Sequence, residues 1–387
     1  ALDAGIYIPH LCYDKRLEPY GGCRLCIVQI EGRPGPVTSC TTEVAEGMVV
    51  HTDTETLRDM RRTLLELILS DHPRQCLTCA KTGTCELQDL AYELGIEEFE
   101  PVHHERPVLV EEVGNAVIYR DPGKCILCGK CVRICAENQG VGAVDFAARG
   151  FDTQVIPALG GLTWDTECEL CGQCVDVCPT GALLVRRAME RGRQKDFTKV
   201  PTVCGYCGVG CNLELNVFKD QVVMVTANPD IPPNHGNLCV KGRFGYEFID
   251  APDRLKRPLI RREGVLVEAS WDEAYDLIAR RMAEIYQQYG PEAVGFVSSS
   301  RCTNEENYLL QKLARAVFGT HNIDQCARAC HAPSVAALAL SFGSGAMSNS
   351  ISEIRNCDCL LVIGSNTTEA HPVIALEMKR AVQRGAN

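Results

Sequence analysis

The segments CILCGKCVRIC (residues 125–135) and CELCGQCVDVCP (residues 168–179) carry one cysteine spacing twice, C-x2-C-x2-C-x3-C. Chance and zinc binding do not produce eight cysteines in so regular an order. Thiolates at this spacing are typical of 4Fe-4S cluster binding. The sequence therefore predicts two such clusters in an internal repeat.

This repeat resembles the bacterial two-cluster ferredoxin, in which the fourth cysteine of each run binds the cluster of the other run. One departure is Ala136, which stands where the motif has proline. The resemblance implies one ligand set of Cys125, Cys128, Cys131 and Cys178, and a second of Cys168, Cys171, Cys174 and Cys135.

The composition agrees with a protein rich in metal sites. The chain has 387 residues and 24 cysteines, mostly in C-x2-C pairs, a spacing that suits metal ligands better than disulfides. A net charge of -11 argues against nucleic-acid binding. No run of 18 apolar residues predicts a membrane span, and the first residues, ALDAGIYIPHLCYD, lack the pattern of a secretory signal. We expect a cytoplasmic protein and interpret the chain as incomplete at both ends.

Near the N-terminus, four cysteines are spaced C-x10-C-x2-C-x13-C around GGCRLC. Gly21 and Gly22 would let the backbone curl around sulfur atoms, as a 2Fe-2S site requires, although zinc remains an alternative. The motif resembles the N-terminal 2Fe-2S domain of the respiratory complex I large subunit, iron-only hydrogenases and NAD-linked formate dehydrogenases, which implies a ferredoxin-like β-grasp fold. The predicted ligands are Cys12, Cys23, Cys26 and Cys40.

The next motif, DHPRQCLTCAKTGTC, offers one imidazole and three thiolates. Its spacing alone fits zinc and a 4Fe-4S cluster about equally. The same three families follow their 2Fe-2S domain with a His-ligated 4Fe-4S cluster, and this resemblance favours the cluster. The predicted ligands are His72, Cys76, Cys79 and Cys85, whereas His103 and His104 lie in a polar linker.

A fifth motif, CGYCGVGC, has its fourth cysteine in NLCVKGRFG. The four cysteines Cys204, Cys207, Cys211 and Cys239 suit another 4Fe-4S site. The motif resembles the opening of molybdopterin oxidoreductases, where such a cluster lies beside molybdenum or tungsten held by two pterin dinucleotides. That resemblance places Lys241 between cluster and pterin; a solvated surface lysine is the alternative.

From about residue 256 the pattern becomes that of an α/β domain with a parallel sheet. Ser270 and Glu273 form a capping-box pattern before a helix that ends at Gly290, and residues 293–299 read as a strand. NEENYLLQKLARAVFG reads as a helix ending at Gly319.

CLLVIGSNTTEAHPVIALEMKRAVQRG predicts a buried strand, a polar loop and a helix. In the loop (364–372), Gly364, Ser365 and Asn366 could bind a phosphate or pterin, and a plain connecting turn fits equally well. FGSGAM follows no predicted strand and carries no dinucleotide signature. Four further cysteines are expected to be small buried residues: Cys302, Cys326, Cys357 and Cys359.

ARACHAP places Cys330 directly before His331, with Arg328 two residues ahead. A soft thiolate suits molybdenum or tungsten. With GSNTTEAHP, this segment resembles formate dehydrogenase, in which the metal ligand, cysteine or selenocysteine, precedes a histidine. The resemblance implies that Cys330 binds the metal, that His331 acts as a base, and that Lys241, Arg328 and the loop contact the pterin.

The domain order resembles the catalytic subunit of multi-cluster, NAD(P)-linked formate dehydrogenases. The expected cofactors are one 2Fe-2S cluster, four 4Fe-4S clusters, and molybdenum or tungsten with two molybdopterin guanine dinucleotides, whose pocket is completed beyond residue 387. The expected domains are a 2Fe-2S domain (1–55), a His-Cys 4Fe-4S domain (56–105), a two-cluster ferredoxin domain (106–195), a molybdopterin oxidoreductase 4Fe-4S domain (196–255) and an α/β catalytic domain (256–387).

Electrons from formate would cross the clusters to a partner subunit of the diaphorase type, containing flavin and iron–sulfur clusters, which reduces NAD(P) in a hetero-oligomer. Three alternatives remain. An electron-conducting subunit like the complex I large subunit would lack Cys330 and His331 and, on this interpretation, the paired ferredoxin runs. An iron-only hydrogenase would continue differently after residue 195. Another molybdoenzyme, such as nitrate reductase, is the closest enzymatic alternative.

Overall fold

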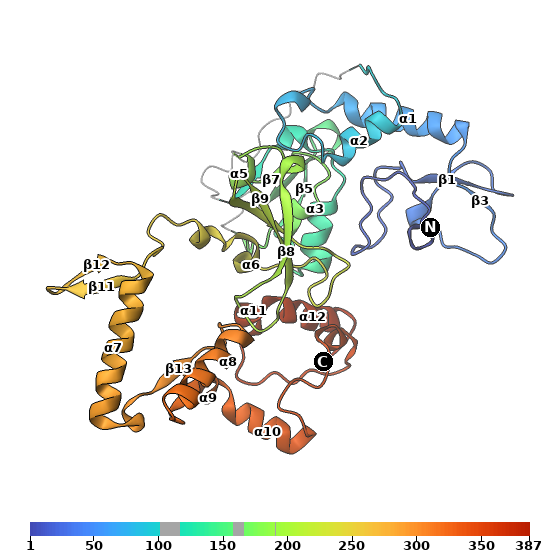
Figure 1. Cartoon of the computed structure of the whole chain (residues 1–387). Helices are drawn as coiled ribbons and strands as arrows, with labels where there is room; N and C mark the ends of the chain where they lie inside the picture. The colour runs from blue at the N-terminus through green and yellow to red at the C-terminus, as the bar shows by residue number, and fades with distance from the viewer. Residues whose placement is uncertain (101–116, 158–165, 190) are drawn as a thin grey trace. The chain divides into compact units, whose positions relative to one another are not determined.

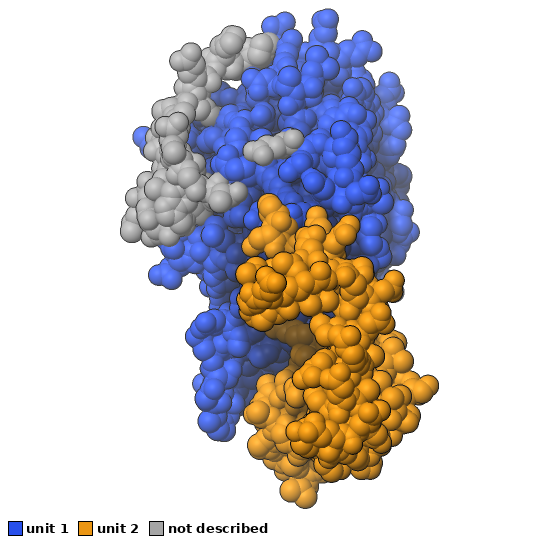
Figure 2. All heavy atoms as spheres, turned by 60° about the vertical axis from the view of Figure 1, so that its left-hand side comes forward, with its two compact units in different colours: residues 1–250, 354–387 blue, residues 251–353 orange. Residues whose placement is uncertain are grey.

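A computed structural model describes residues 1–100, 117–157, 166–189 and 191–387 (Figure 1). His103 and His104 lie outside the described residues. The chain divides into two compact units, residues 1–250 with 354–387, and residues 251–353, shown in blue and orange in Figure 2. Among the described residues, no helix has both the length and the apolar character needed to cross a bilayer.

The N-terminal part of the first unit is a small antiparallel sheet with two helices. Its strands, in the order β2-β1-β3, are β1 (Ile27–Ile30), β2 (Val37–Thr38) and β3 (Val50–His51). The helices are α1 (Glu55–Ser70), which begins at the Thr54 cap, and α2 (Glu86–Glu93). Every fourth residue of α1 from Leu57 to Leu69 is buried, so one stripe faces the core.

Arg61 lies in this stripe and ties α1 to the sheet. Its side chain is 2% exposed and donates hydrogen bonds to the carbonyls of Leu25, Ile27 and Thr52. These bonds replace the hydrogen bonds to water that the guanidinium loses when it is buried.

The two cysteine runs form two similar halves. In each half, a leucine with positive φ (Leu127, 54°; Leu170, 50°) and a glycine with φ 71° (Gly129; Gly172) precede a short helix. The elements are β4 (Ile118–Arg120) paired with β7 (Leu183–Val185), β5 (Val144–Ala147) paired with β6 (Gln154–Pro157), α3 (Lys130–Arg133), α4 (Gln173–Asp176) and α5 (Arg186–Met189). A π-helical turn, Ile134–Asn138, extends α3.

The first unit also contains a three-stranded antiparallel sheet in the order β10-β9-β8. Its strands are β8 (Thr198–Val203), β9 (Asn212–Phe218) and β10 (Gln221–Thr226), and α6 (Val240–Phe244) follows. The chain returns to this unit with α11 (Thr367–Ala370) and α12 (Pro372–Gln383). On α12, Lys379 donates to the Gln139 carbonyl and Arg380 to the Asn138 side chain.

The second unit combines helices with two small strand pairs. The pairs are the antiparallel β11 (Leu259–Arg262) and β12 (Val265–Glu268), and the parallel β13 (Phe296–Ser298) and β14 (Ile323–Gln325). The helices are α7 (Trp271–Tyr289), α8 (Asn304–Lys312) with a π-helical continuation, α9 (Ala327–Cys330) and α10 (Ala332–Phe342). The core contains Val294, Phe296 and Ala314.

Several predicted elements of this region are present. Both halves of the Ser270–Glu273 capping box form, at 3.1 Å and 2.9 Å, and α7 ends at Gly290. β13 lies within the predicted strand, and the π-helical continuation of α8 stops before Gly319, which has φ 64°. FGSGAM follows α10, as expected of a segment without a preceding strand.

The buried strand predicted at CLLVIG is wrong. No strand forms over residues 357–363, and Leu361 and Ile363 are 85% and 79% exposed. An apolar run becomes a strand only where a neighbouring strand completes its hydrogen bonds. Here the Leu360 N–H donates to the Asn387 carbonyl, the Asn387 N–H donates to the Asp358 carbonyl, and the Cys357 N–H donates to the Ile354 carbonyl, so none of these partners belongs to a strand. The following polar loop is also shorter than predicted, because α11 occupies part of it.

The predicted burial of the four remaining cysteines is also wrong. Cys302, Cys326 and Cys359 are exposed, and Cys357 is half-buried. Cys302 and Cys326 belong to the second unit and lie outside its core of Val294, Phe296 and Ala314, whereas Cys357 and Cys359 lie in an irregular segment of the first unit.

Candidate iron–sulfur sites and metal ligand

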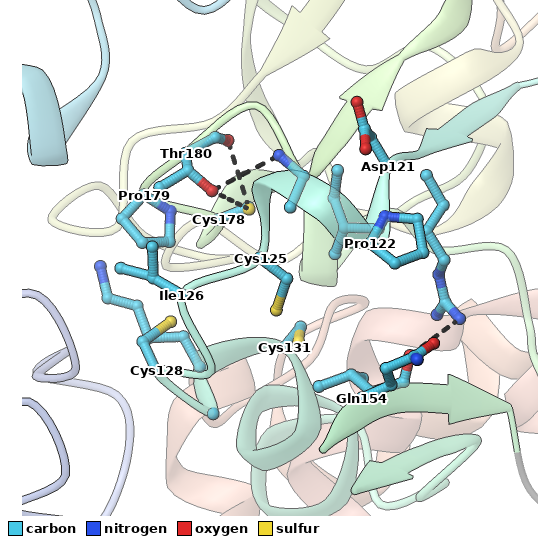
Figure 3. A pocket seen from close by; sticks show the side chains of 16 residues that line it. Asp121, Pro122, Cys125, Ile126, Cys128, Cys131, Gln154, Cys178, Pro179 and Thr180 are labelled. Atoms are coloured by element: carbon cyan, nitrogen blue, oxygen red, sulfur yellow. Dashed lines mark hydrogen bonds between the residues drawn. The ribbon is translucent and has the colours of Figure 1, made fainter. Parts of the chain in front are cut away.

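Four thiols from both cysteine runs surround one cavity of about 40 Å³ (Figure 3). Cys125, Cys128 and Cys131 come from the loop before α3 and from α3 itself, while Cys178 follows α4. This is the ligand set that the ferredoxin resemblance implies.

The second cavity, also of about 40 Å³, has the complementary set. Its lining includes Cys168, Cys171 and Cys174 together with Cys135 from the first run. The Ala143 N–H donates to the Cys135 sulfur at 3.3 Å. The two runs thus exchange their fourth cysteine in space.

The electrostatics of these cavities suit a bound cationic centre. Burial, followed by the charge of Cys178, raises the pKa of Cys128 to about 12. Burial also raises the pKa of Cys171 to about 12, against the opposing effects of the Gln173 backbone N–H and the charge of Arg243. Several buried thiolates would repel one another, and iron ions between them would remove that penalty.

The thiols of each set surround a cavity, as a multi-iron cluster requires and a tetrahedral zinc ion does not.

The four N-terminal cysteines lie as two pairs. The Cys26 and Cys40 sulfur atoms are 3.3 Å apart, and the Cys23 N–H donates to the Cys12 sulfur at 3.4 Å. The hydrogen bond between the Cys12 and Cys23 thiols lowers the pKa of Cys12 to about 5. Gly21, with φ 65°, provides the tight curl beside them. Two pairs of thiolates are the donor set of a 2Fe-2S cluster, one pair per iron.

In the next set, Cys85 is buried and His72 is half-buried. The His72 Nδ1 is buried and has no hydrogen-bond partner among the described residues. Burial, followed by the charge of Lys124, lowers the pKa of His72 to about 4, so the imidazole is neutral at pH 7. A neutral, unpartnered ring is the form that binds a metal. Cys79 is half-buried and Cys76 is exposed.

The cysteines of CGYCGVGC lie between β8 and β9. The Cys204 N–H donates to the Cys211 carbonyl at 2.8 Å, which closes the loop. Burial, followed by the charges of Cys204, Cys207 and Cys239, raises the pKa of Cys211 to about 12. Because the three other cysteines act electrostatically on Cys211, all four predicted ligands lie in one neighbourhood. Lys241, in the short helix α6, is exposed.

Cys330 and His331 occupy the break between α9 and α10. Cys330 ends α9, His331 precedes α10, and both are exposed. Arg328 pairs with Asp324 at 2.8 Å. These residues belong to the second unit.

The predicted loop residues Gly364, Ser365 and Asn366 lie in the first unit, directly before α11. Gly364 has φ 62°, and Asn366 donates to the Glu369 carboxylate at 3.1 Å. The hydrogen bond holds the Asn366 side chain against the first turn of α11. The pterin contacts of the three residues stay a prediction.

One residue of this region could not be singled out from the sequence. Arg243, two residues after Lys241, is 2% exposed and donates to the Cys171 carbonyl at 2.8 Å. Its contact depends on the fold, and the segment KGRFG alone gives no hint that its arginine is buried.

The chain matches known domain families along most of its length. Residues 254–387 match the molybdopterin oxidoreductase family and 197–251 its Fe4S4 domain. The other matches are a 2Fe-2S iron-sulfur cluster binding domain (1–55), an NADH-ubiquinone oxidoreductase-G iron-sulfur binding region (61–100) and an NADH-quinone oxidoreductase subunit 3 ferredoxin-like domain (115–184). The last match corrects one expectation, because the paired ferredoxin runs do not separate this chain from NADH-quinone oxidoreductase subunits.

Similar proteins carry several names. An NADH-quinone oxidoreductase subunit of Rhizobium meliloti, of the type designated G, is 38% identical over 98% of this chain and 44% of its own length. NADPH-Fe(3+) oxidoreductase subunit alpha of Geobacter sulfurreducens is 39% identical over 93% of this chain and 42% of its own. Bacillus subtilis YrhE, provisionally named a formate dehydrogenase, is 34% identical over 97% of this chain and 42% of its own.

The chain spans less than half the length of these relatives. A solved NAD+-reducing [NiFe]-hydrogenase chain is 35% identical, with a TM-score of 0.44, over 48% of this chain and 78% of that one. By its domains and relatives, the chain is a molybdopterin oxidoreductase homologue with additional iron–sulfur domains, related to the G-type NADH-quinone oxidoreductase subunits and to NADPH-Fe(3+) oxidoreductase subunit alpha.

Proposed function

We propose that the chain is part of a formate dehydrogenase, which oxidises formate to carbon dioxide reversibly at molybdenum or tungsten held by two molybdopterin guanine dinucleotides. The observation that carries this proposal is Cys330 followed directly by His331 within the molybdopterin oxidoreductase match. The name of the Bacillus subtilis relative supports it.

Cys330 has the donor chemistry that this metal needs. Its exposed thiol would supply a soft thiolate ligand. The bound metal would accept the two electrons of formate. His331, the next residue, is also exposed. Its imidazole would take up the proton released in the oxidation.

Other residues would bind and orient the pterin dinucleotides. Lys241 follows Cys239 by two positions, and the resemblance to molybdopterin oxidoreductases implies that its ammonium group would lie between a cluster and a pterin. Arg328 would supply a cation, while Gly364, Ser365 and Asn366 would offer backbone N–H, hydroxyl and amide groups.

The cysteine sets would conduct electrons one at a time. The proposed route begins at the cluster of Cys204 to Cys239, crosses the two ferredoxin-like clusters and reaches the His72 cluster and the 2Fe-2S cluster. The chain would belong to a cytoplasmic hetero-oligomer with a diaphorase-type subunit, containing flavin and iron–sulfur clusters, that reduces NAD(P). The NADH- and NADPH-linked names of the relatives, which are subunits, support such a partner.

A second candidate is an electron-conducting subunit without molybdenum or tungsten. The relatives at 38% and 39% identity, which are named for NADH-quinone and NADPH-Fe(3+) oxidoreductases, favour it. The metal content separates the two functions.

The test uses the full-length protein, purified without oxygen. We expect molybdenum or tungsten stoichiometric with the chain, and about 18 iron atoms per chain for one 2Fe-2S and four 4Fe-4S clusters. Formate alone should reduce these clusters, as followed by their absorbance and electron paramagnetic resonance (EPR) signals.

The decisive variant is Cys330→Ser. It should abolish cluster reduction by formate and leave the iron content and dithionite-reduced spectra unchanged. Cys302→Ser, at another exposed cysteine of the same unit, is the matched control and should keep full activity. Iron without molybdenum or tungsten would instead support the electron-conducting subunit, and loss of all clusters in Cys330→Ser would make that cysteine structural.

A further inference from the structure

Arg243 is a buried cation between two of the predicted cluster sites. It lies on α6, which follows Cys239, and its side chain is 2% exposed. Its guanidinium donates to the Cys171 carbonyl at 2.8 Å and to the Gln173 side chain at 3.3 Å, and it lies 3.4 Å from the Asp176 carboxylate. These three partners belong to the second cysteine run or to α4, which carries part of it, and a fourth, the Val225 carbonyl at 3.5 Å, belongs to β10.

The same residue is also bonded to the other site through its backbone. The Arg243 N–H donates to the Cys239 carbonyl at 3.0 Å. One residue therefore connects predicted ligands of two clusters, Cys239 through its backbone and Cys171 through its side chain. The preceding Gly242 lies beside the Cys204 sulfur, which a Cβ there would meet at 3.6 Å.

The second run is shaped to receive this side chain. Gly172, with φ 71°, lies against Arg243, and a Cβ at Gly172 would overlap the Arg243 Cδ and approach the Phe244 ring to 2.9 Å. Glycine is thus required twice at this position, by its backbone conformation and by the close approach of the guanidinium.

A buried amide network holds the same junction from its other side. The Asn237 Oδ1 accepts hydrogen bonds from Asn138 and Gln173, both at 2.6 Å. All three side chains are at most 5% exposed. Since Asn138 follows Cys135 and Gln173 follows Cys171, this network fixes both runs against the segment before Cys239.

The charge of Arg243 bears on the cluster beside it. Asp176 balances part of that charge, and it is shared with Arg16, whose Nη1 lies 3.5 Å from its second oxygen. Reduction adds one negative charge to a cluster, and a nearby buried cation favours the reduced form. Hydrogen bonds and charges around the ligands are known means of tuning such potentials.

We propose that Arg243 is a positioning residue for electron transfer, which holds the cluster of Cys135, Cys168, Cys171 and Cys174 against that of Cys204, Cys207, Cys211 and Cys239 and raises the reduction potential of the former. In each transfer, the cluster of Cys204 to Cys239 would lose one electron and the cluster beside Arg243 would gain it. The proposal rests on the iron–sulfur ligand sets of the proposed function and is independent of formate as the substrate.

The test is a redox titration of the anaerobically purified full-length protein, followed by EPR. The signal lost in Cys171→Ser identifies the cluster concerned. In Arg243→Gln, we expect the reduction equilibrium of this cluster to fall about tenfold, which corresponds to 59 mV for a one-electron couple. Lys199→Gln removes an exposed cation of the same unit and should leave every midpoint unchanged.

Arg243→Lys separates charge from position. It should shift the midpoint less than a third as far as Arg243→Gln, but it should weaken the magnetic interaction between the two reduced clusters, because one ammonium group cannot reach Cys171 and Gln173 together. If Arg243→Gln loses the cluster, Gly172→Ala replaces it, since the added Cβ displaces the guanidinium without removing its charge; the same midpoint should fall.

The outcomes also separate this proposal from the proposed function. The role of Arg243 alone would be overturned by intact clusters whose reduction equilibrium constants stay within threefold of the wild-type values in Arg243→Gln. The same holds for Gly172→Ala where it replaces that variant. Equal shifts in the Gln and Lys variants would overturn the charge effect. A wild-type protein without 4Fe-4S signals would overturn the cluster assignment itself.

Discussion

His72 is the one predicted iron–sulfur ligand that is an imidazole and not a thiol. Its imidazole is neutral because burial lowers its pKa, whereas burial and neighbouring thiols raise the pKa of several cysteines. A ligand set with one neutral imidazole carries one negative charge fewer than a set of four thiolates. The predicted cluster at His72 should therefore accept an electron more readily than its neighbours.

This reasoning predicts the effect of His72→Cys. The variant should keep its iron, because a thiolate also binds the cluster, but its midpoint potential should fall by at least the equivalent of a tenfold change in the equilibrium. Redox titration followed by EPR measures this change. His51→Cys, at an exposed histidine paired with Glu31, is the control. An unchanged midpoint in His72→Cys would remove His72 from the ligand set.

Helix α7 shows which features the sequence determines locally. It is 19 residues long and buries only Ala274, so packing contributes little and its first turn depends on the capping box. The second capping box, Thr303 with Glu306 before α8, has the same chemistry. Such motifs need only neighbouring residues and could be read from the sequence.

Ser270→Ala should destabilise the second unit by about 1 kcal/mol, because the N–H of Glu273 loses its acceptor. Thermal unfolding, followed by circular dichroism, measures the loss. Gln287→Ala, at an exposed position of the same helix, should leave the stability nearly unchanged. Equal effects of the two substitutions would contradict the role of the cap.

Other features could not be predicted because they depend on distant partners. The apolar residues 357–363 have strand composition but no adjacent strand among the described residues. Cys302 and Cys326 are exposed because the small core of the second unit does not include them. The burial of Arg243 depends on carbonyl and carboxylate groups of another cysteine run. The resemblance of the two cysteine runs to a two-cluster ferredoxin, by contrast, predicted the cysteines that line both cavities.

At the scale of the whole molecule, the predicted sites join segments that are far apart in the chain. The first cavity combines residues near 125 with Cys178, and α12 returns to the first unit after the second unit has intervened. Substitutions should therefore group by cavity and not by sequence run.

Cys178→Ser should give the same spectral loss as Cys131→Ser, and Cys135→Ser the same loss as Cys174→Ser. EPR spectra of the dithionite-reduced variants, with iron content per chain, provide the measurement. If Cys178→Ser and Cys174→Ser instead removed the same signal, each run would bind its own cluster and the exchange of fourth cysteines would be wrong.

This exchange also constrains biosynthesis. During translation, the ligand set that begins with the earlier run stays incomplete until Cys178 leaves the ribosome. The set drawn mainly from the later run is complete at Cys174, four residues sooner. The cluster whose ligand set is complete at Cys174 can therefore be inserted first. A nascent chain that stalls between the two runs exposes the four thiols of the earlier run, with no complete site to protect them from oxidation.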